Sequence, residues 1–274
     1  MFSLIEKKID KLGYRGKLRK TIYYKIYMII KSLHMIFDKR MYYLYSRKSF
    51  KDVLNYKHEN NVSSWINSYF KEPENIYVNL KKKPFYPWIC FEAINYITFF
   101  LLKKKNPICF EWGSGTSTLY LSKYAHQIYS IENDVDYYSA VKKSIEENNI
   151  TNVDLINIKE ELNNNNDIEK MKDKYISWKN DYNGKNFYNY VKSIEAQNQK
   201  FDLIFIDGEC RNACFDISFD YLKKDGMIVF DNTSRSIYEE KLKSIDKTYQ
   251  VITVEGPTPY AQTFDKTSFI FKKN

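Results

Sequence analysis

The sequence predicts an α/β domain built on a mostly parallel β-sheet. Four short apolar runs each end in polar or glycine residues, and helical patterns stand between them (residues 107–111, 128–132, 201–208 and 226–232). Short apolar runs that alternate with helices are typical of parallel strands buried on both faces. Because the carboxyl ends of parallel strands meet at one edge of a sheet, we expect the residues that follow them to form one ligand-binding crevice.

The most informative segment covers the first two of these strands. The first strand ends at Glu111, and a tight Gly113-Ser114-Gly115 turn leads into a hydroxyl-rich helix start at residues 116–118. Glycines let a ligand approach the backbone, and the first N–H groups of a helix can face it. The second strand ends at Glu132, 19 residues after Gly113. A carboxylate at that distance is placed to bind ribose hydroxyls, so the segment predicts an adenosine ligand.

The charge next to the turn favours one cofactor over another. A dinucleotide site would carry a third glycine where this chain has Thr118, and it would avoid a negative charge near the pyrophosphate. Glu111 would repel a diphosphate and attract the sulfonium and ammonium of S-adenosylmethionine. The segment therefore favours S-adenosylmethionine over NAD. A glycine turn in an ordinary strand-helix unit is the structural alternative.

Residues 84–274 resemble the class I S-adenosylmethionine-dependent methyltransferases. Residues 111–118 are similar to their first motif, with Ser117 where many members have a third glycine, and residues 129–132 are similar to their ribose-binding strand end. Residues 223–232 are similar to their fifth-strand motif. The resemblance implies a Rossmann-like sheet of seven strands in the order 3-2-1-4-5-7-6, closed by an antiparallel hairpin at residues 249–256 and 267–272.

The motifs assign the cofactor site residue by residue. The methionine part is expected to contact Glu111, Gly113, Ser114, Gly115 and Ser117, and the ribose to contact Glu132. Asn133 and Glu160 are expected near the adenine, and Asp207 at the crevice completes the set.

Methyl transfer to a hydroxyl needs an aligned acceptor and a group that removes its proton. Asp207, Asp231 and Arg211 are the catalytic candidates. By resemblance to catechol O-methyltransferase-like enzymes, Asp207, Asp231 and Asn232 would bind Mg²⁺, although Cys210 stands where those enzymes have a lysine base. Without that lysine, either a metal-bound alkoxide suffices or Asp207 or Asp231 acts as the base without a metal. As the structural alternative, the same residues only cap their turns. Arg211 and Arg235 could also hold an anionic or glycan acceptor.

The basic charge of the chain lies at its N-terminus. Residues 1–60 contain fifteen Lys and Arg and five acidic residues, while the whole chain has a net charge of +9. Apolar residues at helical spacing predict a basic helical extension, followed by a connector at 61–83. The extension could pack on the domain or on a second subunit of a homodimer, lie on an anionic membrane surface, or bind nucleic acid.

Residues 161–198 form a long insert between the third and fourth strands, with an expected helix at 187–196 and an expected role as a lid. The four cysteines have no zinc spacing and indicate reduced thiols. Without a secretory signal or a membrane span, we expect a cytoplasmic protein, peripheral at the inner membrane face if the extension binds lipid. The sequence thus predicts an O-methyltransferase acting on a small molecule or glycan. The alternatives are an RNA methyltransferase that uses the basic arm and a non-catalytic S-adenosylmethionine-binding protein.

Overall fold

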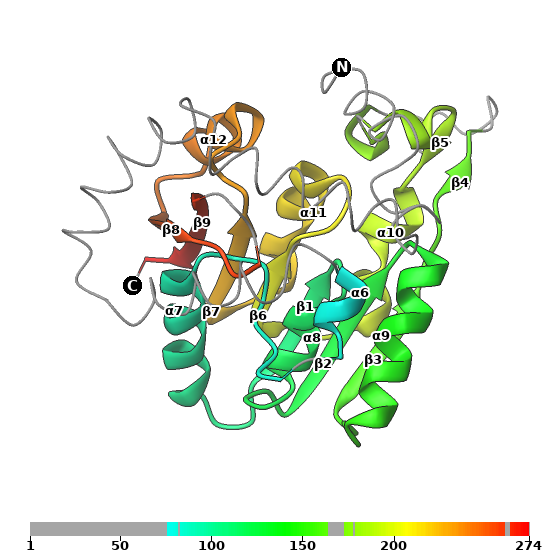
Figure 1. The fold of residues 1–274 in the computed structure, drawn as a ribbon. Helices are drawn as coiled ribbons and strands as arrows, with labels where there is room; N and C mark the ends of the chain where they lie inside the picture. Colours follow the sequence, from blue (N-terminus) through cyan, green and yellow to red (C-terminus); the bar gives the residue numbers. More distant parts are fainter. Residues whose placement is uncertain (1–75, 82, 164–172, 178, 261–263, 274) are drawn as a thin grey trace, which may run out of the picture. The chain divides into compact units, whose positions relative to one another are not determined.

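Figure 1 shows the fold in a computed structural model, which describes residues 76–81, 83–163, 173–177, 179–260 and 264–273. The chain divides after Asn75, and each described element belongs to the unit Ile76–Asn274. The predictions for residues 1–60, and for the connector before residue 76, lie outside the described residues. Within the described ranges, no helix combines the length and the apolar character that crossing a membrane requires.

Seven strands form one sheet in the order β3-β2-β1-β6-β7-β9-β8. They are β1 (Ile108–Trp112), β2 (Gln127–Glu132), β3 (Val153–Asn157), β6 (Phe201–Ile206), β7 (Leu222–Asp231), β8 (Tyr249–Pro257) and β9 (Phe264–Lys272). The first five in the order are parallel, and β9 and β8 are antiparallel to their neighbours. Counted along the chain within this sheet, the order is 3-2-1-4-5-7-6, which confirms the prediction.

The order of the strands reverses between β1 and β6. From β1 the chain proceeds outward to β2 and β3, and it then returns to β6 on the other side of β1. Glu111 of β1 therefore pairs with Ser130 of β2 and with Phe205 of β6. In open α/β sheets, ligands bind beyond the carboxyl ends of the strands at such a reversal. The fold places the glycine turn that follows β1 at this point.

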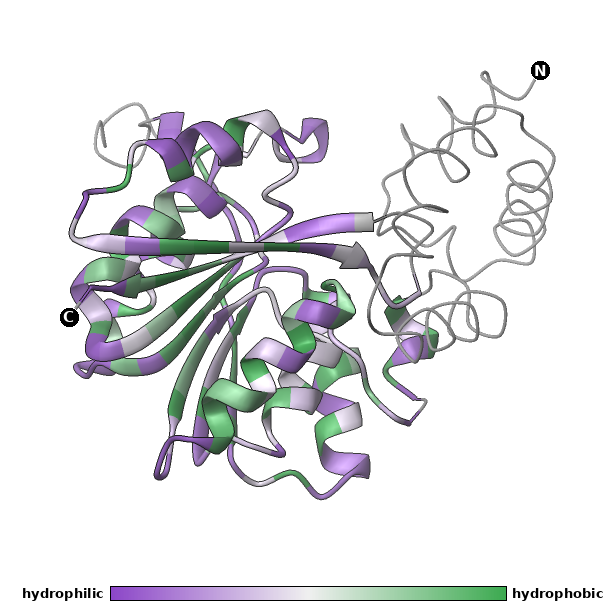
Figure 2. Ribbon diagram, turned by 90° about the vertical axis from the view of Figure 1, so that its left-hand side faces the viewer, coloured by the Kyte–Doolittle hydropathy of each residue, from purple (hydrophilic) through white to green (hydrophobic). Residues whose placement is uncertain are grey.

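Helices cover both faces of the sheet, whose strands are largely hydrophobic (Figure 2). They are α6 (Ile76–Asn79), α7 (Phe91–Leu102), α8 (Thr116–Leu121), α9 (Val135–Glu147), α10 (Tyr188–Lys192), α11 (Arg211–Ser218) and α12 (Ser236–Lys243). One core cluster joins α6, α8 and α9 to the sheet through side chains such as Leu80, Leu119 and Val141. A larger cluster joins α10, α11 and α12 to the other face, around Phe110, Ile204 and Phe230.

The insert at 161–198 contains more structure than its sequence predicts. Two short strands, β4 (Glu161–Leu162) and β5 (Lys185–Asn186), pair antiparallel as a separate two-stranded sheet. The short 3₁₀ helices η3 (Asp173–Tyr175), η4 (Asn180–Tyr182) and η5 (Glu195–Gln197) add to it. The helix expected at 187–196 is limited to α10, because the chain changes to 3₁₀ geometry at η5 and reaches a left-handed residue, Asn198, with φ 49°.

The strand expected at 226–232 begins earlier than its apolar run indicates. The helical residues before it stop at the 3₁₀ helix η6 (Phe219–Tyr221). Strand β7 begins at Leu222, which pairs with Phe201, and its register shifts before Met227 pairs with Leu203. Lys223 and Lys224 can belong to β7 because they lie at the start of the strand, where their side chains reach solvent.

Candidate active site at the carboxyl ends of the strands

The turn after β1 is packed tightly against its neighbours. Gly113 has a φ of 91°, a left-handed conformation that favours glycine. A Cβ at Gly113 would lie 2.8 Å from the backbone of Asp207 and Gly208, and one at Gly115 would lie 2.9 Å from the hydroxyl of Tyr137. From the sequence, both glycines were expected to let a ligand approach the backbone. In the structure they also let the loop after β6 and helix α9 pack closely against the turn.

Glu111 lies fully buried in β1, beneath α8. Its carboxylate accepts hydrogen bonds from the hydroxyls of Ser117, of Thr118 at 2.5 Å and of Ser130 at 2.7 Å. Burial raises the pKa of Glu111 to about 7, although the three hydroxyl groups act to lower it. The carboxylate is thus held behind the turn by two hydroxyls from the start of α8 and one from β2, and its contact with a ligand stays a prediction.

Glu132 connects the end of β2 to the glycine turn. One carboxylate oxygen accepts from the backbone N–H groups of Asn133 at 3.0 Å and Asp134 at 2.9 Å. The other accepts from the hydroxyl of Ser114 at 3.1 Å. The side chain is 1% exposed, so these bonds fix its orientation. The structure therefore brings together the turn and the acid that the sequence assigned to one adenosine ligand.

The insert contacts the two residues that were expected near the adenine. The amide of Asn133 donates to the hydroxyl of Tyr182 at 3.0 Å. Glu160 forms a salt bridge with Lys185, with 2.7 Å between Oε1 and Nζ. The insert thus lies over the carboxyl ends of β2 and β3, which is where a lid for a cofactor would have to be.

Glu209 anchors the insert to the loop after β6. It is 4% exposed, forms a salt bridge with Lys179 and accepts from the hydroxyl of Ser177 at 3.0 Å. The insert residues Ser177 and Lys179 lie about thirty positions earlier in the chain, so spacing in the sequence carries no signal for these contacts. Neither Ser177 nor Lys179 is among the predicted site residues.

The three residues expected to bind a metal gather around Arg211, the first residue of α11. Its Nη2 atom lies 2.7 Å from a carboxylate oxygen of Asp207, and its Nη1 atom donates to the side-chain oxygen of Asn232 at 2.9 Å. Asp231 lies farther off, with 3.8 Å between Nη1 and Oδ2. Asn232 follows β7 in a left-handed conformation with φ 57°, which ends the extended backbone of the strand. The catalytic and metal candidates therefore form one cluster.

Asp231 is the most enclosed member of this cluster. It is 1% exposed and accepts a hydrogen bond from the hydroxyl of Thr267 in β9 at 2.7 Å. Burial raises the pKa of Asp231 well above its usual range, and the charge of Asp207 raises it further, while Arg211 acts in the opposite direction. Two carboxyl groups and one guanidinium thus share a site in which Asp231 holds a proton more readily than an exposed aspartate.

The cysteines form no metal site in the described ranges, where no group of three or more His, Cys, Asp or Glu could hold an ion. All four are free thiols. Burial raises the pKa of Cys90 and of Cys210 to about 12, which makes both poor nucleophiles. Cys210 occupies the position at which the catechol O-methyltransferase-like enzymes have a lysine base. Because its thiol stays protonated near neutral pH, it cannot replace that lysine as a base.

Aromatic residues before β1 pack against the loop between β8 and β9. The ring centroid of Tyr260 lies 6.5 Å from that of Tyr86 and 6.1 Å from that of Trp88. Tyr260 is 1% exposed and has a φ of 64°. Tyr86 and Trp88 therefore take part in packing this loop against the residues before β1.

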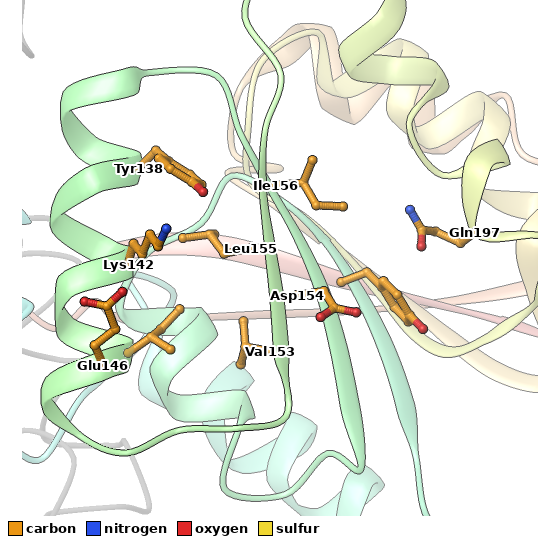
Figure 3. Close-up of a pocket in the computed structure, with 10 residues that line it drawn as sticks. Tyr138, Lys142, Glu146, Val153, Asp154, Leu155, Ile156 and Gln197 are labelled. Atoms are coloured by element: carbon orange, nitrogen blue, oxygen red, sulfur yellow. The ribbon is translucent and has the colours of Figure 1, made fainter.

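A recess of about 470 Å³ lies away from these residues, along the edge strand β3 (Figure 3). Side chains of β3 such as Leu155 line it together with Lys142 and Glu146 of α9, and Gln197 of η5 faces it from the other side. None of the sequence-predicted site residues lines this recess.

Comparison with solved structures identifies the fold. An O-methyltransferase from Bacillus cereus, solved in complex with SAH, matches with a TM-score of 0.53 and 14% identity over 78% of this chain and 98% of its own. A methyltransferase from Podospora anserina, also SAH-bound, matches with a TM-score of 0.51 and 14% identity over 83% and 97%. The described unit has the class I methyltransferase fold. No model of a protein family and no curated protein sequence matches the chain.

The methyltransferase fold brings most of the expected residues to one edge of the sheet. Among the residues expected to contact the cofactor, Ser114 is hydrogen-bonded to Glu132 and Ser117 to Glu111, and Asp207 adjoins the turn at Gly113. Glu160 lies away from the turn, after β3, where it forms a salt bridge with Lys185 of the insert. Sequence reasoning missed Ser130 and Thr267, whose hydroxyls bind the two buried acids. A hydroxyl between apolar residues was the signal available for Ser130, whereas Thr267 stands between Lys266 and Ser268 and has no such signal.

Proposed function

We propose that this chain is an S-adenosylmethionine-dependent methyltransferase that methylates a hydroxyl group of a small molecule or glycan. The observation that carries the proposal is the joining of Glu132 to the glycine turn through Ser114, at the reversal of the strand order. That geometry presents a carboxylate beside a turn where a ribose would bind. The fold supports the proposal, and the two similar structures named above contain SAH.

The residues present fit an adenosyl sulfonium ligand. Glu132 would accept from the ribose hydroxyls, Asn133 and Glu160 would flank the adenine, and the turn at 113–117 would adjoin the methionine part. Behind the turn, Glu111 is a buried carboxyl that becomes negatively charged near neutral pH. A negative charge in a low-dielectric environment favours a cationic ligand and disfavours a diphosphate. This is the electrostatic basis for preferring S-adenosylmethionine to NAD.

S-adenosylmethionine supplies a methyl group attached to a positively charged sulfur. The protein has to align the acceptor oxygen and take up the proton of the hydroxyl. The side chain of Asp207 is 22% exposed, whereas that of Asp231 is 1% exposed. A general base must be within reach of the proton it abstracts. We therefore assign the proton-accepting role to Asp207 and a positioning role to Asp231.

The insert is proposed to cover the cofactor and to take part in acceptor selection. Its contacts reach the ends of three strands through Tyr182, Lys185 and Lys179. Asn133 is 4% exposed beneath it, so a ligand beside Asn133 would be enclosed. Long structured loops over the ends of strands commonly serve this purpose.

Calorimetric titration of the full chain with S-adenosylmethionine and with NAD tests the cofactor assignment. We expect S-adenosylmethionine to bind and NAD not to bind. Glu132→Ala should weaken binding at least tenfold, because it removes the ribose partner, while Glu146→Ala on the exposed face of α9 should leave it unchanged. Binding of NAD alone, or equal affinities of both variants for S-adenosylmethionine, would reject the assignment.

The reaction type is tested with S-adenosylmethionine labelled in the methyl group and a panel of phenols and sugars. Transfer to oxygen yields an ether, whose label is stable to alkali, whereas a carboxyl methyl ester loses its label. Asp207→Asn should abolish transfer and keep cofactor binding. A base-labile product would contradict O-methylation of a hydroxyl.

A further inference from the structure

Arg211 has a complete set of acceptors in the loops after β6 and β7. A guanidinium carries five N–H donors in a fixed plane. Nε donates to the carbonyl of Gly208 at 3.0 Å, and Nη1 donates to the carbonyl of Asp231 at 3.1 Å and to the side chain of Asn232 at 2.9 Å. Nη2 donates to the carbonyl of Asp207 at 2.9 Å and contacts its carboxylate at 2.7 Å. Five donors thus meet five acceptors.

This arrangement removes Arg211 from the residues that could bind an anionic acceptor. Its side chain is 11% exposed, and its donors already point into the protein. The expectation that Arg211 contacts the substrate therefore does not fit its geometry. It is a positioning residue, which fixes the loop that carries Asp207 relative to Asp231 at the end of β7.

The same guanidinium stands where a divalent cation would have to bind. A Mg²⁺ ion held by Asp207, Asp231 and Asn232 would need one oxygen from each side chain within about 2.1 Å. Instead, one side-chain oxygen of each residue faces Arg211, at 2.7, 3.8 and 2.9 Å. A second cation among these oxygens would be repelled by the buried positive charge. The residues present therefore do not fit the metal that the resemblance implied.

We propose that the guanidinium of Arg211 replaces the divalent cation at this end of the sheet, and that the site works without a metal ion. The positive charge is supplied from within the chain, by the first residue of α11, and it cannot be removed by a chelator. The consequence for catalysis rests on the proposed function, because Asp207 then acts as the base beside a fixed cation.

Binding of Mn²⁺ to the full-length protein tests this directly, through the loss of the electron paramagnetic resonance signal of free Mn²⁺. We expect no wild-type binding that depends on Asp207. Arg211→Ala should bind Mn²⁺ at least tenfold more tightly than wild type, because it exposes the three oxygens. The double variant Arg211→Ala/Asp207→Asn should lose this binding again. Arg235→Ala is the matched control, since Arg235 is exposed and its guanidinium lies at the same 5.8 Å from the Tyr238 ring.

Stoichiometric Mn²⁺ binding by the wild type that Asp207→Asn abolishes would overturn the inference, and so would a folded Arg211→Ala variant without any gain. The wild-type measurement stands even if Arg211→Ala fails to fold. Titration of the same wild-type sample with S-adenosylmethionine separates the two proposals. A protein that binds both Mn²⁺ and the cofactor contradicts only the metal inference, and one that binds neither contradicts only the proposed function.

Discussion

Replacing Glu111 by glutamine should change how the stability of the protein depends on pH. The pKa of this buried carboxyl is raised to about 7, so the folded protein holds the proton more tightly than the unfolded chain does. Stability from this group is therefore greatest below pH 4.5 and decreases as the pH rises towards 7. Moving the pKa of a carboxyl from 4.5 to about 7 corresponds to roughly 3 kcal/mol.

Glutamine has nearly the same shape and does not titrate in this range. The hydroxyls of Ser117, Thr118 and Ser130 can rotate, so they can accept from the new amide as well as donate to its oxygen. The wild-type free energy of unfolding should fall by roughly 3 kcal/mol more than that of Glu111→Gln between pH 4.5 and pH 7. Burial is the main cause of the shift, so little of this effect should be screened by salt.

The assay is urea unfolding at a series of pH values, followed by fluorescence and by far-UV circular dichroism, so that a two-state transition can be verified. Glu146→Gln, at an exposed position on α9, serves as the control and should follow the wild type. If the free energy of unfolding depends on pH in the same way in the wild type and in Glu111→Gln, then ionisation of Glu111 does not cause the loss of stability.

Three further predictions concern packing and the insert. Gly208→Ala should destabilise the protein by about 1–3 kcal/mol in urea unfolding, because its Cβ would lie 1.9 Å from the hydroxyl of Tyr190, and adding Tyr190→Phe should recover part of the loss. If the double variant is no more stable than Gly208→Ala, the clash is assigned wrongly. Asn149 follows α9 with φ 52°, so Asn149→Ala should cost about 1 kcal/mol while Asn149→Gly costs nothing, and equal losses would contradict the left-handed cap. Tyr182→Phe removes the hydrogen bond with Asn133, so stopped-flow binding of S-adenosylmethionine should show faster association and dissociation, and unchanged rates would argue against a lid.

The strands could be predicted because the relevant signals are local, whereas their order followed from the resemblance of the motifs to a known family. A buried parallel strand is a short apolar run, and β6 is buried at all six residues. The acids at the ends of β1, β2, β6 and β7 and the glycines of the turn after β1 are also readable along the chain. The positions of Glu111 and Glu132 at one edge of the sheet follow from the topology alone.

The contacts that define the chemistry could not be predicted, because they join residues far apart in sequence. Arg211 looked like a substrate-binding residue, since the sequence shows a charge without showing its acceptors. The number of acceptors around Arg211 depends on how the loops after β6 and β7 approach each other. The β4–β5 pair was missed because strands of two residues have no periodicity.

We infer that an adenosyl sulfonium ligand binds over the carboxyl ends of β1 and β2. A crystal structure of the full chain grown with S-adenosylhomocysteine would locate its nucleoside. We expect the ribose hydroxyls within hydrogen-bonding distance of Glu132, and the thioether beside the glycine turn. A nucleoside bound elsewhere, or one whose ribose lies away from Glu132, would contradict it.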